Sequence, residues 1–185
     1  MRITGSGGPL LVTLAIDAYS EEADPEAGRR HRRHSDVGDR LNLAKYHSDT
    51  RSADDAFAEL VGQMITIAQS EDECAGASAV IATPGSDAAT QGLSEKLAHD
   101  IALELSLPLV SVRSRLSGRR SAKKKASNRT GDYELVSQVS GRVLVVDDVF
   151  STGATLVAVA QAALEAGAAE CVGLVAARKL PPPSA

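Results

Sequence analysis

The segment 143–155 constrains the fold of this chain more than any other. It reads VLVVDDVFSTGAT, and an alanine-rich stretch follows it up to Ala166. The apolar run over 142–146 predicts a buried strand that ends at Asp147 and Asp148, and the Ser-Thr-Gly turn after the acids predicts the start of a helix. A strand, a short turn and a helix in this order indicate one unit of an α/β protein with a parallel sheet.

Hydrophobic patterning predicts further strands and helices before and after this unit. Strands are expected at 9–16, 78–83, 109–112, 133–139 and 170–176, and helices at 52–69, 93–105 and 154–166. The strands are mostly unbroken apolar runs rather than alternating ones, so both faces of the sheet should be covered. The predicted fold class is therefore α/β, with a central parallel sheet flanked by helices.

Three segments lack apolar periodicity and are predicted to be loops. Residues 18–40 mix acidic and basic residues and are interpreted as a surface loop or a disordered insertion. Residues 118–131 form a long basic loop, and the tail 180–185 is expected to fray. The expected organisation is an amino-terminal strand and polar insertion over 1–40, a main domain over 41–179, and the tail.

Composition argues against several classes of protein. Aromatic residues make up 3% of the 185 residues and Trp is absent, which disfavours a reader of single-stranded nucleic acid by base stacking. The formal net charge of −4 disfavours a protein that coats DNA, although eight basic residues and no acid lie between Arg113 and Arg129. Cys74 and Cys171 match no disulfide or zinc pattern. No apolar run is long enough for a membrane span, so we expect a cytoplasmic protein with reduced cysteines.

The turn after the two acids has the chemistry of an anion site. Backbone N–H groups of such a turn and of a helix N-terminus favour negative charge, and the hydroxyl groups of the turn add donors. The carboxylates of Asp147 and Asp148 would repel a phosphate, but they suit sugar hydroxyls, or Mg²⁺ held with those hydroxyls. The pattern therefore predicts a phosphorylated sugar as ligand. A capped turn that binds nothing is the alternative interpretation.

The string 143–155 closely resembles the ribose-5-phosphate loop of the type I phosphoribosyltransferases, which bind 5-phosphoribosyl 1-pyrophosphate (PRPP). The stretches 43–47, 78–83 and 128–135 stand in the order seen in the ComF-like competence proteins, an amidophosphoribosyltransferase-like group of that family. The resemblance implies a type I phosphoribosyltransferase-like fold over 41–179. It also implies a small hood, expected here from the amino-terminal region.

The resemblance implies a role for each candidate residue. Asp147 and Asp148 would contact the ribose hydroxyls and are the candidate catalytic residues. The 5-phosphate would be bound by Ser151, Thr152, Gly153, Ala154 and Thr155. The pyrophosphate would be bound by the turn of Thr83, Pro84, Gly85 and Ser86. A flexible basic loop would close over the site with Arg115, Arg119, Arg120, Lys123, Lys124 and Lys125. Mg²⁺ is the expected cofactor, carried by PRPP and contacted by the two acids rather than by a metal site of the protein alone.

The implied activity is a pentosyltransferase reaction of nucleotide metabolism, in which a base or an amine takes the phosphoribosyl group and pyrophosphate leaves. Stacking candidates for the acceptor are Tyr46, Tyr133 and Phe150. The alternative is a PRPP sensor without turnover, or a ComF-like accessory protein of DNA uptake whose basic loop touches nucleic acid. The expected partners are PRPP or ribose 5-phosphate, an unidentified acceptor and a second copy of the chain, with no membrane.

Overall fold

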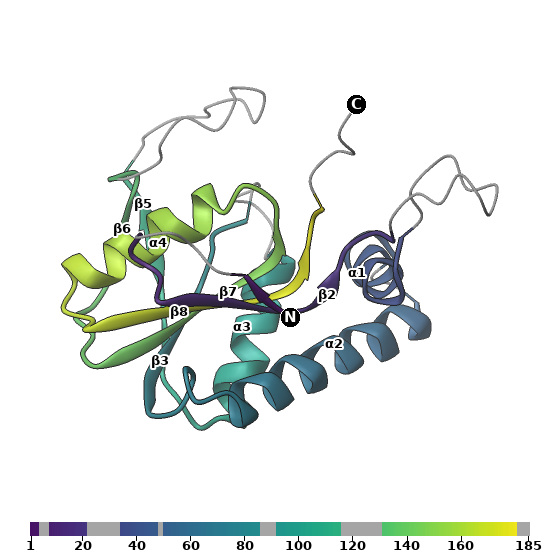
Figure 1. Ribbon diagram of the computed structural model, residues 1–185, viewed down its shortest axis with the longest axis horizontal. Coiled ribbons are helices and arrows are strands. Elements are labelled where there is room, and N and C mark those ends of the chain that lie inside the picture. The colour runs from purple at the N-terminus through teal and green to yellow at the C-terminus, as the bar shows by residue number, and fades with distance from the viewer. Residues whose placement is uncertain (4–7, 22–33, 48–49, 86–91, 116–130, 181–185) are drawn as a thin grey trace.

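The computed structural model describes residues 1–3, 8–21, 34–47, 50–85, 92–115 and 131–180 (Figure 1). The helices in these residues are α1 (Asp36–Tyr46), α2 (Arg51–Ser70), α3 (Leu93–Glu104) and α4 (Ala154–Glu165). The strands are β1 (Arg2–Ile3), β2 (Val12–Ala18), β3 (Ala77–Ala82), β4 (Leu109–Val110), β5 (Val112–Ser114), β6 (Tyr133–Leu135), β7 (Arg142–Phe150) and β8 (Glu170–Arg178). None of the described helices combines the length and the apolar character of a membrane span.

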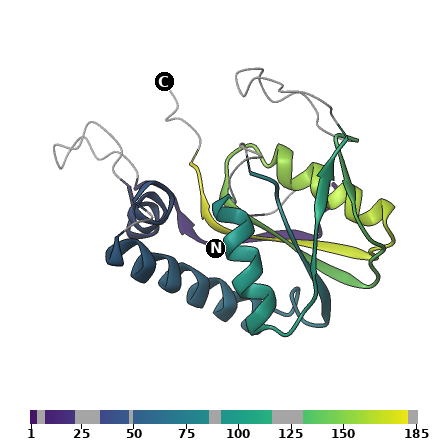
Figure 2. The same ribbon diagram turned by 180° about the vertical axis from the view of Figure 1, so that it is seen from behind.

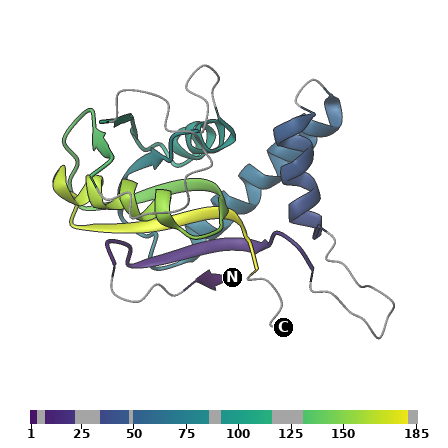
Figure 3. The ribbon, with the colours of Figure 1, turned by 90° about the horizontal axis from the view of Figure 1, so that it is seen from above.

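Six strands form the main sheet, in the order β1-β2-β8-β7-β3-β4. Only β1 runs antiparallel to its neighbour, and all other neighbours are parallel. Seen from above, β2, β8 and β7 lie side by side (Figure 3). The structure confirms the predicted α/β class with a central, mostly parallel sheet flanked by helices.

Both faces of the sheet are covered because its central strands are apolar on both faces. In β7, Leu144 and Val146 pack on the side of α2 and α3, whereas Val143 and Val145 pack on the side of α4. All four side chains are fully buried. Figure 1 shows α4 above the sheet and α2 with α3 below it. An unbroken apolar run is what a strand buried on both faces requires.

A second, smaller sheet pairs β5 with β6 in antiparallel fashion and lies beside α4. It corresponds to the small hood expected for this fold, but it comes from the middle of the chain, on either side of the predicted basic loop. The strand expected over 109–112 is divided between the two sheets. Val110 pairs with β3 and Val112 pairs with β6, so the chain passes from one sheet to the other at Ser111.

Helix α1 corrects the interpretation of 18–40 as a loop, because it begins at Asp36. The Ser35 hydroxyl accepts a hydrogen bond from the Gly38 N–H (3.1 Å), which caps the helix. Val37 and Leu41, one helical turn apart, are buried against the sheet. These two are the only large apolar side chains of the helix that are buried, so its periodicity is too weak to stand out in the sequence. Residues 22–33 lie outside the described part of the chain.

Strand β7 is longer than expected, because it continues through both acids instead of ending at them. Its pairing with β8 extends to Phe150, which lies opposite Arg178. Adjacent residues of a strand point to opposite faces of the sheet. The side chains of Asp147 and Asp148 therefore point to opposite faces of the sheet, and each contacts different residues.

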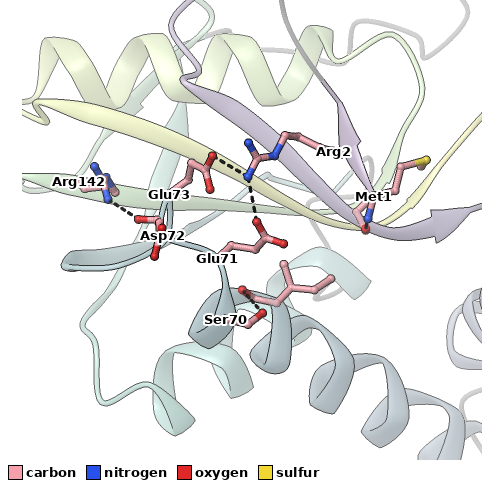
Figure 4. A network of polar contacts seen from close by, with 9 residues as sticks. Met1, Arg2, Ser70, Glu71, Asp72, Glu73 and Arg142 are labelled. Atoms are coloured by element: carbon pink, nitrogen blue, oxygen red, sulfur yellow. Dashed lines mark hydrogen bonds and ion pairs between the residues drawn. The ribbon is translucent and has the colours of Figure 1, made fainter.

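The amino end of β7 carries a polar network that fastens the connection between α2 and β3 (Figure 4). Arg2 pairs with Glu71 (3.0 Å) and Glu73 (2.7 Å), and the Arg142 guanidinium donates to the carbonyl oxygen of Asp72 (3.1 Å). These groups lie at the opposite end of β7 from the two acids. The network stabilises the connection between α2 and β3, and it does not involve the carboxyl ends of the strands, where a ligand can bind.

Candidate functional site

The carboxyl ends of β3 and β7 lie where the connections of the sheet diverge. From β3 the chain passes through α3 to β4, and from β7 it passes through α4 to β8 in the opposite direction. The two helices cover opposite faces of the sheet (Figure 2). Ligands of open α/β sheets bind at such a switch point. The two loops singled out in the sequence therefore come together at one end of the sheet.

The turn after β7 depends on Gly153, which precedes the first residue of α4. Its φ of +72° is a left-handed conformation, and a Cβ there would lie 2.7 Å from a ring carbon of Phe150. Glycine alone satisfies both conditions. Phe150 is thus occupied in holding the turn, which argues against its predicted role in stacking on an acceptor.

The start of α4 offers backbone donors to an anion. The first N–H groups of a helix have no partner within the helix, and the dipole makes this end positive. The first turn of α4 contains no acidic residue, and Ser151 and Thr152 are exposed beside it. The Thr152 hydroxyl lies 3.4 Å from the Ala154 nitrogen. The five residues predicted to bind a 5-phosphate, 151–155, are brought together at this helix end.

Asp147 is held by the turn that follows β3. Its Oδ1 accepts hydrogen bonds from the Thr83 hydroxyl (2.8 Å) and from the Asp148 N–H (2.9 Å). Burial, and next the charge of Asp148, raise the pKa of Asp147 from 3.8 to about 7, although the Thr83 hydrogen bond acts in the other direction. A carboxylate placed in this way accepts hydrogen bonds readily and tolerates a proton near neutral pH.

Asp148 is paired with a residue that the sequence reasoning did not assign. The Lys45 ammonium on α1 lies 2.5 Å from Asp148 Oδ2, and Oδ1 accepts from the Val149 N–H (2.8 Å). Burial alone would lower the pKa of Lys45, but the hydrogen bond and the charge of Asp148 outweigh it and raise that pKa. Lys45 stands in the stretch 43–47 that carried the family resemblance, so a signal for it was present.

The turn after β3 is anchored from both sides. Thr83 is buried, and its carbonyl oxygen accepts a hydrogen bond from the buried Ser94 hydroxyl at the start of α3 (2.9 Å). Pro84 and Gly85 follow it at the same end of the sheet, and Ser86 lies outside the described residues. The structure thus brings Thr83, Pro84 and Gly85 next to the end of β7, as the predicted pyrophosphate turn requires.

Of the predicted basic loop, only Arg115 belongs to the described residues. Its guanidinium pairs with Glu134 (3.2 Å) on β6 and reaches Glu165 (4.0 Å) on α4. Arg115 is therefore engaged at the base of the small sheet. The other five basic residues, Arg119, Arg120, Lys123, Lys124 and Lys125, lie outside the described part of the chain. The closing loop stays a prediction.

A metal held by the protein alone has no support among the described residues, where no three metal-ligating side chains gather. The two acids offer few free oxygens, because Asp147 binds Thr83 and Asp148 binds Lys45. Such a pair suits Mg²⁺ that arrives with a substrate and keeps substrate oxygens as its main ligands. That the metal comes with PRPP stays a prediction.

Comparison with protein-family models finds one domain in the chain. Residues 90–179 match the phosphoribosyl transferase domain, a little under half of the sequence. The matched part includes both acids, the glycine turn and α4. No curated protein matches the chain.

Solved structures provide a second comparison. Orotate phosphoribosyltransferase from Aeropyrum pernix is 26% identical over 66% of this chain, with a TM-score of 0.44, and the chain spans only 59% of its length. Adenine phosphoribosyltransferase from Leishmania tarentolae is 13% identical over 95% of this chain and 94% of its own, with a TM-score of 0.49. Adenine phosphoribosyl transferase from Trypanosoma brucei is 15% identical over 85% of this chain and 76% of its own, with a TM-score of 0.46.

Proposed function

We propose that this chain, in which residues 90–179 match the phosphoribosyl transferase domain, binds PRPP and transfers its phosphoribosyl group to a nitrogen acceptor with release of pyrophosphate. One observation carries the proposal. The hydrogen bond between Thr83 and Asp147 joins the turn after β3 to the end of β7, directly before the glycine turn of α4. The turn proposed for pyrophosphate, the two acids and the helix end proposed for the 5-phosphate thereby lie close to one another.

PRPP offers three groups that fit these three features. Its 5-phosphate suits the start of α4, where N–H groups and the helix dipole favour an anion. The ribose hydroxyls suit Asp147 and Asp148, whose oxygens accept hydrogen bonds. The pyrophosphate suits the turn at Thr83–Gly85, whose backbone is fixed through Thr83. This assignment leaves no carboxylate facing a phosphate, which would be repulsive.

The proposed reaction is a displacement at C1 of the ribose. The bond between C1 and the pyrophosphate oxygen breaks, the electron pair leaves with pyrophosphate, and the acceptor nitrogen forms a new bond to C1. Positive charge develops on the sugar and negative charge on the leaving group. Fixed groups at the site favour both changes, because the carboxylates lie near the sugar and backbone amides lie near the phosphates. Positioning of the two reactants then supplies much of the rate.

Mg²⁺ enters this scheme as part of the substrate. When it is bound to PRPP, it neutralises charge on the pyrophosphate and makes it a better leaving group. The residues of this chain orient the ribose of the Mg²⁺-PRPP complex. Asp147 is oriented by Thr83, and Asp148 is oriented by Lys45.

The experiment that tests the function is a calorimetric titration of the protein with PRPP, with and without Mg²⁺, together with a pyrophosphate-release assay over a panel of bases and amines. Mg²⁺-dependent binding and release with one acceptor class would support transfer. The double variant Asp147→Asn/Asp148→Asn should bind PRPP at least about 100-fold more weakly, since it loses both charged hydrogen-bond acceptors. A folded double variant that binds PRPP as tightly as the parent would refute the assigned carboxylate roles.

The matched control is Asp54→Asn/Asp55→Asn, which removes two exposed acids from α2 and should leave PRPP binding unchanged. PRPP binding without pyrophosphate release on any acceptor would favour the alternative function, a PRPP sensor or a ComF-like accessory protein of DNA uptake. If the protein does not bind PRPP, neither the proposed transfer nor the alternative function of a PRPP sensor holds. Single-stranded DNA would then be the ligand to test, and its binding should weaken steeply with salt.

A further inference from the structure

A cavity of about 260 Å³ lies beside the two acids, between α1 and the carboxyl ends of β7 and β8. None of the groups of PRPP has been assigned to this cavity above. The residues that matter for its chemistry are Tyr19, Asn42, Lys45, Tyr46, Asp148 and Lys179. Figure 1 shows α1 beside the end of β2, with the end of β8 rising next to it. The volume is just below the range of ~300–1,000 Å³ typical of small-molecule pockets, so it suits a compact ligand.

The cavity shares part of its wall with the PRPP site. Asp148 and Ser151 line it, and both belong to the segment proposed to hold the ribose and its 5-phosphate. A molecule in the cavity would therefore lie directly against the bound sugar. This is the position that an acceptor must take to reach C1, because a displacement needs the two reacting atoms in contact.

The wall of the cavity carries more positive than negative charge. Lys45 and Lys179 are its cations, and Asp148 is its one acid. Asp148 is already paired with Lys45 at 2.5 Å. Within the described part of the chain, the Lys179 ammonium has no carboxylate at ion-pair distance and no hydrogen-bond partner. One positive charge at the cavity is thus left without compensation.

The remaining wall offers flat apolar surface together with hydrogen-bonding groups. Two tyrosines and the apolar side chains of Leu41 and Val149 supply the surface, and the Asn42 amide supplies a donor and an acceptor. Tyr46 is 68% exposed, which leaves its ring accessible to a ligand. A planar ring with polar substituents matches such a wall.

We propose that this cavity is the acceptor site and that it selects a compact, planar heterocycle bearing a carboxylate, which Lys179 binds. The inference rests on the proposed function, whose acceptor it specifies. The ring nitrogen forms the bond to C1 as the bond to pyrophosphate breaks, pyrophosphate leaves with the electron pair, and any proton on that nitrogen passes to solvent. Lys45 stays with Asp148 and keeps the acid in place for the ribose.

The experiment compares ligands that differ only in charge. Calorimetric titrations use nicotinate against nicotinamide, and 6-carboxyuracil against 6-carbamoyluracil, with and without Mg²⁺-PRPP, and adenine serves as a neutral bicyclic comparator. The carboxylate of at least one pair should bind about 10-fold more tightly than its amide, as expected for a charge-assisted hydrogen bond. Equal binding within both pairs, or preference for the neutral members or for adenine, would overturn the proposal.

Variants assign the preference to Lys179. In Lys179→Gln the carboxylate and the amide should bind within about 2-fold of each other, whereas Lys179→Arg should keep most of the preference because it keeps the charge. Arg51→Gln removes a positive charge from an exposed position outside the cavity wall and should change nothing. A preference that persists in Lys179→Gln would contradict the assignment. Lys179 is exposed, so these variants should keep the parent's melting temperature.

Titration of PRPP itself separates the two levels of the proposal. If PRPP binds and no carboxylate preference is found, the acceptor inference fails while the proposed function stands. If PRPP does not bind, the proposed function fails, and an acceptor site loses its basis with it. If PRPP binds, the carboxylate is preferred and Lys179→Gln abolishes the preference, both stand.

Discussion

The Thr83 hydroxyl lies 2.8 Å from Asp147 Oδ1 and donates to it, although the two residues are 64 positions apart. Thr83 is the first residue after β3, and Asp147 belongs to the neighbouring strand β7. The Thr83 N–H also donates to the carbonyl oxygen of Val146 (2.9 Å). The turn proposed for pyrophosphate and the acid proposed for ribose are therefore one mechanical unit, and a change in either should affect both.

Thr83→Val should destabilise the protein by roughly 1–3 kcal/mol, because it keeps the shape of the side chain and removes one of the two hydrogen-bond donors to a buried carboxylate. It should also raise the pKa of Asp147 further, since the lost hydrogen bond favoured the ionised form. Urea denaturation at pH 7.5 measures the free energy of unfolding. Thr66→Val is the control, because that hydroxyl bonds the Gly62 carbonyl oxygen on an exposed part of α2. Equal losses in both variants would contradict the prediction.

Asp147→Asn should make stability less dependent on pH. The raised pKa means that the folded chain binds the Asp147 proton more tightly than the unfolded chain. Between pH 4 and 7 the folded state therefore holds more protons, and the free energy of unfolding falls as the pH rises. Above pH 7 the whole penalty is present, so the variant should be more stable than the parent there, by up to roughly 4 kcal/mol for a rise of about three pKa units.

This gain should shrink as the pH falls and should be close to zero below about pH 3, where Asp147 of the parent is protonated in both the folded and the unfolded state. Denaturation series at several pH values measure the difference between parent and variant. The exposed acid variant Asp55→Asn should show no such trend. If the free energies of unfolding of Asp147→Asn and the parent differ by a constant amount from pH 4 to pH 8, the burial of the ionised acid is not the cause of the difference.

Gly153→Ala should cost more stability than Gly76→Ala, and the comparison separates two effects. Both glycines have a positive φ, +72° and +70°, so both variants carry a similar backbone penalty of about 1 kcal/mol. A Cβ at Gly76 meets nothing within 4 Å, whereas one at Gly153 meets the Phe150 ring at 2.7 Å. We expect Gly153→Ala to lose roughly another 1–2 kcal/mol from this overlap, together with PRPP affinity.

Phe150→Leu in the Gly153→Ala background provides the check on this explanation. Removal of the ring should recover part of the stability lost through contact, but none of the part lost through backbone strain. Thermal denaturation of the four proteins, parent, two single variants and double variant, gives the coupling between the two positions. Strict additivity would show that the overlap with Phe150 is not what makes glycine necessary.

Both cysteines should be unreactive in the native protein. Burial raises the pKa of Cys74 to about 11 and that of Cys171 to about 12, so little thiolate forms at pH 8. They lie on opposite faces of the sheet, one with α2 and α3 and the other with α4, and cannot pair. A chromogenic disulfide reagent should label no thiol within minutes at pH 8 and two after denaturation in urea. Rapid labelling of the native protein would contradict the burial of these side chains.

The sequence predicted the elements whose burial is marked by many apolar residues. The start of β7 and the bounds of α4 were expected nearly correctly, as were the bounds of α2, which has a full stripe of buried side chains. Helix α1 was missed because Val37 and Leu41 are its main buried apolar residues. The extension of β7 to Phe150 was missed because its last residues are held by pairing with β8 and not by their own hydrophobicity.

The candidate site was predicted in part for a similar reason. Its residues that are adjacent in the chain, such as Asp147 and Asp148, form a local pattern that can be read directly. Their partners Thr83 and Lys45 are 64 and 103 positions away, and only the order of strands in the sheet brings them close. Thr83 was expected near the site through the resemblance, but its bond to Asp147 was not.

Because each acid is paired with a residue far away in the sequence, the chain cannot be shortened to the recognised domain without loss of these pairings. The recognised domain covers 90–179, yet Thr83 and Lys45, the side chains that hold Asp147 and Asp148, both precede it. Strands β2 and β3, which flank β8 and β7, precede it as well. An expression fragment trimmed to the recognised boundaries would contain every residue of the motif and neither of its polar supports. Strands β7 and β8, which have nine residues each, would lose their outer neighbours and become open edges that are prone to self-association.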